Sequence, residues 1–307
     1  MNADRFQDIE EKGGLLRLPG RACFRLTGAD RVRYLNGQVT QDVRLANDQE
    51  THYACVTDVK GRLVGDGFIH ASSADSALYL DAEPSLREVL GPRLERYIIS
   101  DDVELVDVTD EWELWHLFGP EVDSFNGVDG SALRSQRLGC AGVDLWVRKG
   151  EPDPDLGVPV LTEEEGEVLR VLRGVPKFPN ELGSETFPPE AGLGARAMSY
   201  TKGCYIGQEI LSRIRTSGKM PRRLVRWESE GAQDEFAVGD LLFGEGEGGV
   251  AKKVGEVTSL AFHPTLERWV GLAYLKSSVW PVDSGLLVGG CEPRIGRQVK
   301  ISSLVNQ

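Results

Sequence analysis

The sequence predicts an α+β fold in which a larger domain, residues 1–225, precedes a smaller β-barrel domain, residues 226–307. Two observations indicate this division. Helical and strand periodicities alternate through the first part of the chain, whereas short apolar runs between glycine, proline and acidic turns follow residue 226. A length of 307 residues is enough to bury a large core and to form two domains.

The first part contains several strand patterns and one clear helix pattern. Strands are predicted over residues 52–57, 62–70, 77–82, 103–108 and 113–118. The first two of them flank a glycine turn and should form a hairpin. Apolar side chains close to helical spacing predict a helix over residues 84–97.

Two more helices and the strands of the barrel complete the predicted fold. Thr162 is the expected N-cap of a helix that runs to Arg173, with Glu165 as its reciprocal partner in a capping box. A further apolar helix face is expected over residues 208–214. Barrel strands are predicted over residues 240–243, 255–262, 269–275, 285–288 and 298–301.

Composition indicates an ordinary soluble protein, with 40% hydrophobic and 27% charged residues. No stretch approaches the roughly 20 apolar residues that cross a bilayer, so we expect no membrane partner. The acidic N-terminal residues lack the apolar centre of a signal peptide, and the expected location is the cytoplasm.

Charge is distributed unevenly along the chain. The net charge of −13 argues against direct nucleic-acid binding. The segment from Arg196 to Arg226 nevertheless holds eight Lys or Arg residues and a single acid, Glu209, for a local net charge of +7. Such a segment favours an anionic partner, for which a polyglutamyl folate tail, a phosphate and an acidic protein are the candidates. The alternative is a solvated helix face.

Five cysteines lie far apart in the sequence, at Cys23, Cys55, Cys140, Cys204 and Cys291. An odd, dispersed set without a Cys-x-x-Cys pair is neither a disulfide framework nor a self-contained metal site, and we predict no metal ligands in this chain. A cluster bound at a cysteine would therefore need ligands from another chain or from external thiols.

One cysteine stands out by its neighbours. Cys204 lies between Gly203 and Gly207, two residues after Lys202 and shortly before a predicted helix. An ammonium group and a helix N-terminus both stabilise a thiolate, so we predict a reactive Cys204 supported by Lys202. The alternative is a small buried residue on a tight turn.

The same residues carry a family resemblance. Tyr200–Glu209 resembles the signature of the YgfZ family, which includes the mitochondrial assembly factor IBA57, and Tyr34–Val43, Phe187–Glu190 and Gly255–Ser259 follow in family order. These proteins bind folate and assist the maturation of iron–sulfur enzymes. They are similar in turn to the glycine-cleavage T-protein, a tetrahydrofolate-dependent aminomethyltransferase.

The resemblance implies a T-protein-like folate-binding α+β domain followed by a C-terminal β-barrel. It implies tetrahydrofolate or a derivative as cofactor, and iron–sulfur assembly or client proteins as partners, with a transient cluster shared with such a partner. Any effect on tRNA modification would be indirect, through iron–sulfur enzymes that modify tRNA.

Four more site residues follow from the resemblance. Asp66 ends a stretch similar to the one that carries the T-protein's catalytic aspartate, although Gly65 replaces the first acid of the pair. It would bind the pterin or hold a proton near an amine; the alternative is an exposed hairpin-turn aspartate. Arg170 matches a family arginine, but Leu172 stands where the family has a pterin-binding glutamate and Arg173 where it has alanine.

The remaining two candidates are Arg222 and Arg223, in a segment similar to the one from which T-proteins present a basic residue to folate. An arginine fork suits the carboxylate end of folate; the alternative is a charged linker. The leading hypothesis is thus folate-binding iron–sulfur assembly or repair through Cys204. The alternative is an aminomethyltransferase, and whether the chain is an enzyme stays open.

Overall fold

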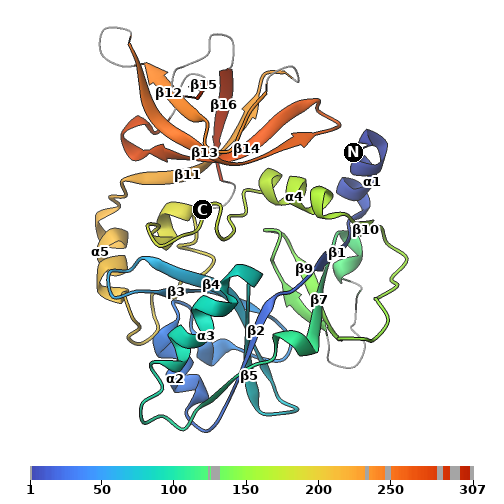
Figure 1. Ribbon diagram of the computed structural model, residues 1–307, viewed down its shortest axis with the longest axis vertical. Helices are drawn as coiled ribbons and strands as arrows, with labels where there is room; N and C mark the ends of the chain where they lie inside the picture. Colours follow the sequence, from blue (N-terminus) through green and yellow to red (C-terminus); the bar gives the residue numbers. More distant parts are fainter. Residues whose placement is uncertain are drawn as a thin grey trace.

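The computed structural model describes residues 2–123, 125, 132–231, 235–245, 250–281, 286–290 and 298–304. Two sheets with their covering helices form one end of the molecule and a closed barrel forms the other (Figure 1). Helix α4 (Glu163–Leu172) lies between them. This arrangement confirms the predicted α+β fold with a C-terminal barrel.

The first sheet is antiparallel throughout, with strands in the order β3-β4-β5-β2-β6. Its strands are β3 (His52–Thr57), β4 (Leu63–Ser72), β5 (Ala77–Ala82), β2 (Ala22–Thr27) and β6 (Glu104–Asp107). Helices α2 (Arg31–Gln38) and α3 (Arg87–Glu95) cover one face, where Leu35, Leu90 and Leu94 pack into the core.

The second sheet has the strand order β10-β1-β7-β9-β8, with only the β10–β1 pair parallel among these strands. Its strands are β10 (Val160–Leu161), β1 (Gly14–Leu18), β7 (Trp112–Phe118), β9 (Gly142–Arg148) and β8 (Ala132–Ser135). Tyr79 of the first sheet shares a buried cluster with Leu114 and Trp146 of the second. The two sheets therefore pack against each other at this cluster.

The barrel closes in the order β11-β14-β13-β12-β15-β16. Its strands are β11 (Arg222–Ser229), β14 (Arg268–Lys276), β13 (Ala251–His263), β12 (Leu241–Glu245), β15 (Leu286–Gly289) and β16 (Gln298–Ser303). Trp227 fills the barrel core against Gly271, where a Cβ atom would overlap the indole ring. Glycine at this position is thus required by packing.

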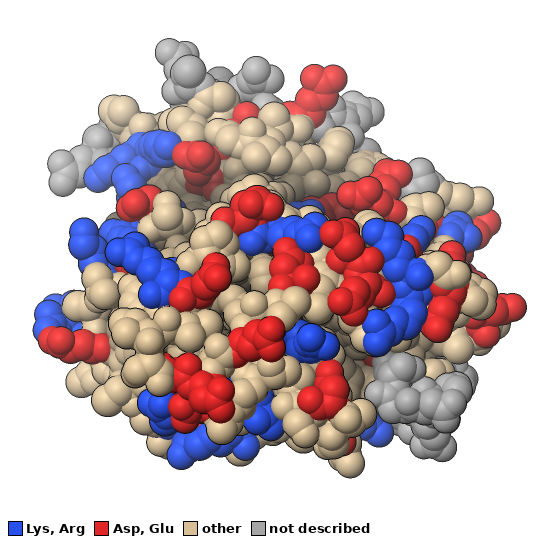
Figure 2. Space-filling view, turned by 60° about the horizontal axis from the view of Figure 1, so that its bottom comes forward, with Lys and Arg blue, Asp and Glu red and all other residues tan. Residues whose placement is uncertain are grey.

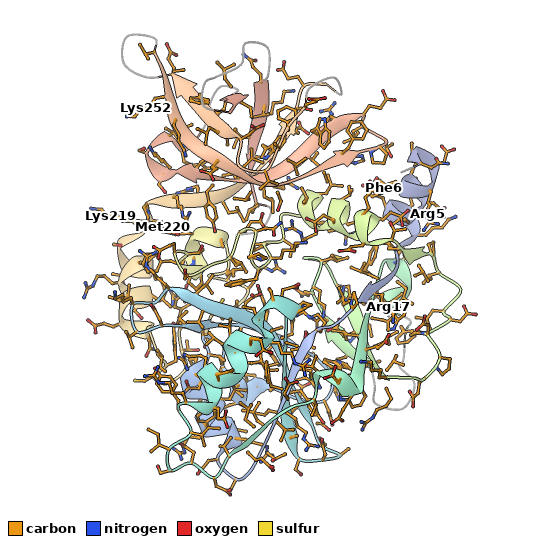
Figure 3. The ribbon with its side chains drawn as sticks, viewed as in Figure 1. Arg5, Phe6, Arg17, Lys219, Met220 and Lys252 are labelled. Carbon is orange, nitrogen blue, oxygen red and sulfur yellow. The ribbon has the colours of Figure 1, made fainter. Side chains whose placement is uncertain are left out.

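Helix α1 (Ala3–Lys12) joins the barrel to the rest of the molecule (Figure 3). Phe6 packs its ring against His263 of β13 at 5.2 Å. Arg5 forms an ion pair with Glu165 of α4. Because Glu165 also closes the capping box with Thr162, the N-terminus of α4 and helix α1 are fixed together.

Most predicted elements are present, with two differences. The predicted helix 84–97 begins as a 3-10 turn, Pro84–Leu86, and its α-helical part ends at Glu95. The first barrel strand begins at Arg222, so it starts before the predicted domain boundary at residue 225. The division into two domains stays a prediction. Residue 285 of one predicted strand lies outside the described residues. Helix α5 (Gln208–Ser217) and the capping box of α4 are as predicted.

None of the helices among the described residues is long and apolar enough to cross a membrane.

Candidate functional site

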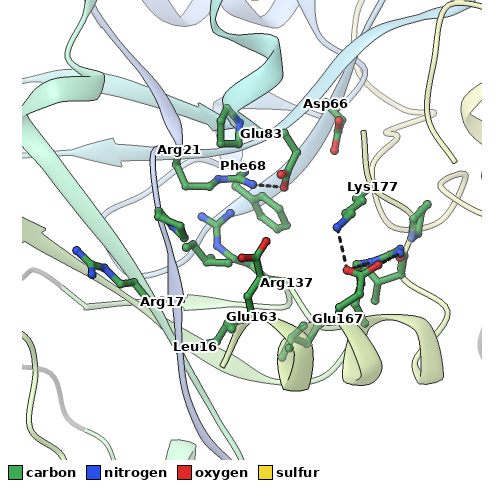
Figure 4. A pocket seen from close by; sticks show the side chains of 18 of the residues that line it. Leu16, Arg17, Arg21, Asp66, Phe68, Glu83, Arg137, Glu163, Glu167 and Lys177 are labelled. Carbon is green, nitrogen blue, oxygen red and sulfur yellow. Dashed lines mark hydrogen bonds and ion pairs between the residues drawn. The ribbon is translucent and has the colours of Figure 1, made fainter. Parts of the chain in front are cut away.

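A cavity of about 560 Å³, which we call the central cavity, lies between the two sheets and helix α4. The segment from β1 to β2, strands β3 and β4, helix α4 and the loop that follows it all contribute to its wall (Figure 4). Leu16, Leu18 and Leu138 give it an apolar side, and several charged groups line the remainder. This size and mixture are typical of a small-molecule site.

Asp66 on β4 is the central polar group of this cavity. Its side chain is buried, with 7% of its surface exposed, and Oδ2 accepts a hydrogen bond of 2.7 Å from the Tyr53 hydroxyl. Its other oxygen, Oδ1, is buried and has no partner among the described residues. Burial raises the pKa of Asp66 to about 6, although the Tyr53 hydrogen bond opposes the shift. Asp66 is therefore not an exposed turn residue.

Two aromatic rings stand beside Asp66. Tyr53 and Phe68 are direct cross-strand partners on β3 and β4, and their rings stack at 4.7 Å. Phe68 and Asp66 are two residues apart on one strand, so both face the cavity. The guanidinium of Arg137 lies 4.1 Å from the Phe68 ring centre. Phe68 thus stacks on both Tyr53 and Arg137, and this aromatic surface lies next to a hydrogen-bond acceptor.

A buried ionic network supports this surface. Arg137 donates to both carboxylate oxygens of Asp81, at 2.9 and 2.7 Å, and to Asp144 at 2.8 Å. Arg21 is paired with Asp81 and with Glu83. Because breaking one member would leave a buried charge, the network holds both sheets in a fixed relation around the cavity. The two arginines are neutralised by their partners.

Arg170 also lines the cavity, but its donors are committed to the protein. Its guanidinium is bonded to Glu167 at 2.6 Å, Glu181 at 3.1 Å and the Ser259 hydroxyl at 2.8 Å. Ser259 belongs to β13, so Arg170 links α4 to the barrel. We assign it a positioning role, whereas its predicted contact with folate stays a prediction.

Lys202 is buried, whereas its predicted support of the Cys204 thiolate stays a prediction. Its ammonium donates to the carbonyls of Asn36, Val39 and Gln41 at 2.5, 2.8 and 2.7 Å. Burial lowers the pKa of Lys202 to about 7, while three carbonyl acceptors match the three donors of the charged form. The Lys202 ammonium thus anchors the Tyr200–Glu209 segment to α2 and the loop that follows it, a role that the sequence did not suggest.

Cys204 is exposed, four residues before the first residue of α5. Gly207 is the N-cap of that helix, with φ at 88°, and a Cβ atom there would lie 2.6 Å from the carbonyl oxygen of Asp58. The second glycine of the motif is therefore required by packing against the β3–β4 hairpin. At Gly203, by contrast, a Cβ atom would meet no other atom within 4 Å, so packing does not require this glycine.

Arg222 and Arg223 do not join Asp66 in the cavity that the described residues form. Arg222 pairs with Glu190 at 3.1 Å and lies over the Tyr274 ring, and Arg223 lies 5.2 Å from the Trp280 ring centre. Lys219 and Met220, just before them, appear on the opposite side of the molecule from Arg17, which lines the cavity (Figure 3). The structure brings Asp66 and Arg170 together and places these two arginines elsewhere.

Within the described ranges, no group of three or more His, Cys, Asp and Glu side chains could hold a metal ion. Cys23 and Cys55 are buried and Cys140 is partly exposed, while Cys291 lies outside the described residues.

The cavity residues that surround Asp66 were not predicted from the sequence, among them Tyr53, Phe68, Arg21 and Arg137. The alternation of side chains along β4 would have indicated Phe68, because it lies two residues from Asp66. The predicted hairpin would have indicated Tyr53, its cross-strand partner, whereas Arg21 and Arg137 are brought to the site by tertiary packing, for which the sequence holds no local signal.

The fold is that of the glycine-cleavage T-protein. The solved structure of aminomethyltransferase T from Bartonella henselae superimposes with a TM-score of 0.80 at 16% identity, over 98% of this chain and 87% of that one. No protein-family model matches the chain.

Sequence comparison places the chain among two kinds of relatives. An aminomethyltransferase of Rubrobacter xylanophilus is 28% identical over 294 residues, covering 83% of this chain and 73% of that protein. The iron–sulfur cluster assembly factor IBA57 of Homo sapiens is 27% identical over 236 residues, covering 68% of this chain and 64% of its own length. The predicted resemblance to IBA57 and to T-proteins is confirmed.

Proposed function

We propose that this chain binds a reduced folate in the central cavity and assists iron–sulfur cluster assembly or repair. The pterin ring would lie against Tyr53 and Phe68, with its N–H groups donating to Asp66. The T-protein fold and the aminomethyltransferase and IBA57 relatives support the ligand class and the process.

The observation that carries the proposal is the free oxygen of Asp66. A buried carboxylate oxygen without a hydrogen bond is costly, and its partner is expected from a ligand when the protein supplies none. The amide and amine N–H groups of a pterin are donors of this kind, and its ring can pack against the aromatic residues beside Asp66. The described residues therefore fit a folate head group.

Cys204 would act at the surface and not in the folate cavity. It is the exposed cysteine of the described residues. A surface thiol can share a cluster with a partner protein without any further ligand from this chain. The proposal thus has two separate sites, one for folate and one for the partner.

The test of the folate site is a calorimetric titration with tetrahydrofolate. Native protein should bind saturably, and Asp66→Asn should weaken binding about 100-fold, because its amide N–H groups oppose the donors of the pterin. Asp48→Asn, which changes an exposed loop acid, is the matched control and should bind as the native protein does. Absence of binding by the native protein contradicts the proposal.

A second candidate is folate-dependent aminomethyl transfer, favoured by one observation. A carboxyl group with a pKa of about 6 is well placed to exchange a proton with an amine near neutral pH. Methylene-tetrahydrofolate formed from an aminomethyl donor by the native chain, but not by Asp66→Asn, would establish this activity.

A further inference from the structure

A second cavity of about 370 Å³ lies where the loop between β8 and β9 meets the C-terminal end of α4 and the barrel strand β11. Cys140 lines it together with three arginines, Arg173, Arg196 and Arg226. We call it the arginine cavity. Its lining contains no Asp or Glu among the described residues, and its volume falls in the range of small-molecule sites, which begins at about 300 Å³.

Cys140 is in direct contact with one of these arginines. The cysteine is partly exposed, and Arg173 donates a hydrogen bond of 3.1 Å to its sulfur atom. Arg173 is the C-cap residue of α4, and its guanidinium also lies 4.9 Å from the Phe118 ring centre, which fixes the donor beside the thiol. Since the nucleophilic form of a cysteine is the thiolate, the guanidinium places a positive charge beside the atom that would carry the negative charge in an attack.

The other two arginines of the cavity have only neutral acceptors among the described residues. Arg196 donates to the carbonyl of Gln136 at 3.0 Å, and Arg226 donates to the carbonyl of Leu172 at 2.6 Å. The Nε atom of Arg226 is buried and has no partner in the described part of the chain. Because a guanidinium has five N–H donors, both side chains keep donors for an anionic ligand.

Arginines elsewhere in the molecule are neutralised by acids. Arg21, Arg137 and Arg170, which line the central cavity, are each paired with two carboxylates. On the surface in Figure 2, Lys and Arg side chains are interspersed with Asp and Glu. A cavity lined by one sign of charge attracts ligands of the opposite sign, and arginine forks bind carboxylates bidentately. A ligand with carboxylates and a sulfur atom open to attack would therefore match both the arginines and the thiol.

We propose that the arginine cavity is a site of thiol–disulfide exchange, at which Cys140 takes up one half of a small peptide disulfide that carries carboxylates. Glutathione disulfide belongs to this class, because each half is an acidic tripeptide with one sulfur atom. Arg173 would act at the Cys140 sulfur, and Arg196 and Arg226 would hold the carboxylates. The proposed function does not use Cys140, so this inference stands apart from it.

The exchange needs no oxidant other than the small disulfide. Cys140 loses its proton to solvent, and its thiolate attacks one sulfur of the bound disulfide. The S–S bond of the disulfide breaks as a new S–S bond forms between that sulfur and Sγ of Cys140. The other half leaves as a thiolate and takes up a proton from solvent. One disulfide is consumed and one is formed, so the electrons balance.

The experiment treats the native chain with three disulfides that differ in charge: anionic glutathione disulfide, neutral hydroxyethyl disulfide and cationic cystamine. Peptide mass mapping gives the rate of mixed-disulfide formation at Cys140 separately from that at Cys204. Each rate is divided by the rate of the same reagent with 2-mercaptoethanol, which corrects for its inherent reactivity. At Cys140, glutathione disulfide should react at least about tenfold faster than cystamine at low salt, and high salt should reduce this preference.

Variants locate the source of the preference. Arg226→Gln and Arg196→Gln should each lower the rate with glutathione disulfide about fivefold and leave the rate with hydroxyethyl disulfide unchanged, because they alter only the attraction of the anion. Arg173→Gln should slow all three reagents, since it removes the donor at the sulfur, and Arg173→Lys should restore part of the rate. Arg213→Gln, on the exposed face of α5, is the matched control and should leave every rate unchanged.

Two results would overturn the inference. One is the absence of any charge preference at Cys140 in the native chain at low salt, including the case in which only Cys204 is modified. The other is a preference for glutathione disulfide that survives when Arg196→Gln and Arg226→Gln are combined, because the arginine cavity would then not be its source. The rate with hydroxyethyl disulfide shows whether the combined variant is still folded around Cys140.

Discussion

The central cavity and the Tyr200–Glu209 segment use their charged groups in opposite ways. In the cavity, Arg21 and Arg137 are neutralised by acids, and Oδ1 of Asp66 has no partner among the described residues. In the Tyr200–Glu209 segment, the Lys202 side chain donates to three backbone carbonyls, and the side chain of Cys204 is exposed. The comparison teaches that the most recognisable motif supplies a surface thiol on a rigid support, while the ligand chemistry lies in residues scattered along the chain.

The largest expected effect concerns the surface site. Cys204→Ser should abolish rescue of iron–sulfur enzyme activity in cells that lack the chain, because a hydroxyl does not replace a thiolate as a cluster ligand. Tetrahydrofolate affinity and the midpoint of thermal unfolding should not change. Cys140→Ser is the matched control and should rescue fully. Full rescue by Cys204→Ser would show that the motif serves only the fold.

Next in size is the effect of removing the buried ammonium. Lys202→Met should lower the free energy of unfolding by about 3 kcal/mol, since three carbonyls lose their donor in a buried place. Urea unfolding measures this, and Lys219→Met, in the exposed loop after α5, should change stability little. If Lys202→Met leaves stability intact but slows alkylation of Cys204, the lysine acts on the thiol, as the sequence alone suggested.

A smaller effect is expected on the stability of the ligand-free chain. The pKa of Asp66 is raised from 3.8 to about 6, so between these values the folded chain holds a proton that the unfolded chain releases. Stability should therefore fall as the pH rises from about 4 to about 6, and the loss is complete above pH 6. Asp66→Asn should remove this dependence and stabilise the ligand-free protein at pH 7.5 by about 2 kcal/mol. An unchanged pH profile would show that the carboxylate is not desolvated.

The smallest effect is predicted for the arginines that the sequence favoured. Arg223→Gln should change the affinity for tetrahydrofolate by less than about twofold, because its side chain faces Trp280 and not the central cavity. Isothermal titration calorimetry of the native chain and the variant measures the two affinities. A loss of tenfold or more would place the carboxylate end of the ligand at the β11 segment, as the sequence predicted.

Local signals made much of the fold predictable. The capping box of Thr162 and Glu165 and the glycine turn between β3 and β4 are properties of a few neighbouring residues, and the structure has both. The site was harder to predict, because its contacts join distant segments. Arg137, between β8 and β9 of the second sheet, donates to Asp81 on β5 of the first sheet. The sequence also held no sign that Lys202 is buried and bonded to three carbonyls while Cys204, two residues later, is exposed.

The central claim is that the free oxygen of Asp66 receives hydrogen bonds from a bound folate. It is tested most directly by following the carboxyl carbon of Asp66 by ¹³C NMR through a pH titration, with and without tetrahydrofolate. The account predicts a pKa of about 6 in the free protein and a value well below it in the complex, because donors on the ligand favour the ionised form. A pKa that stays the same when tetrahydrofolate is saturating would contradict it.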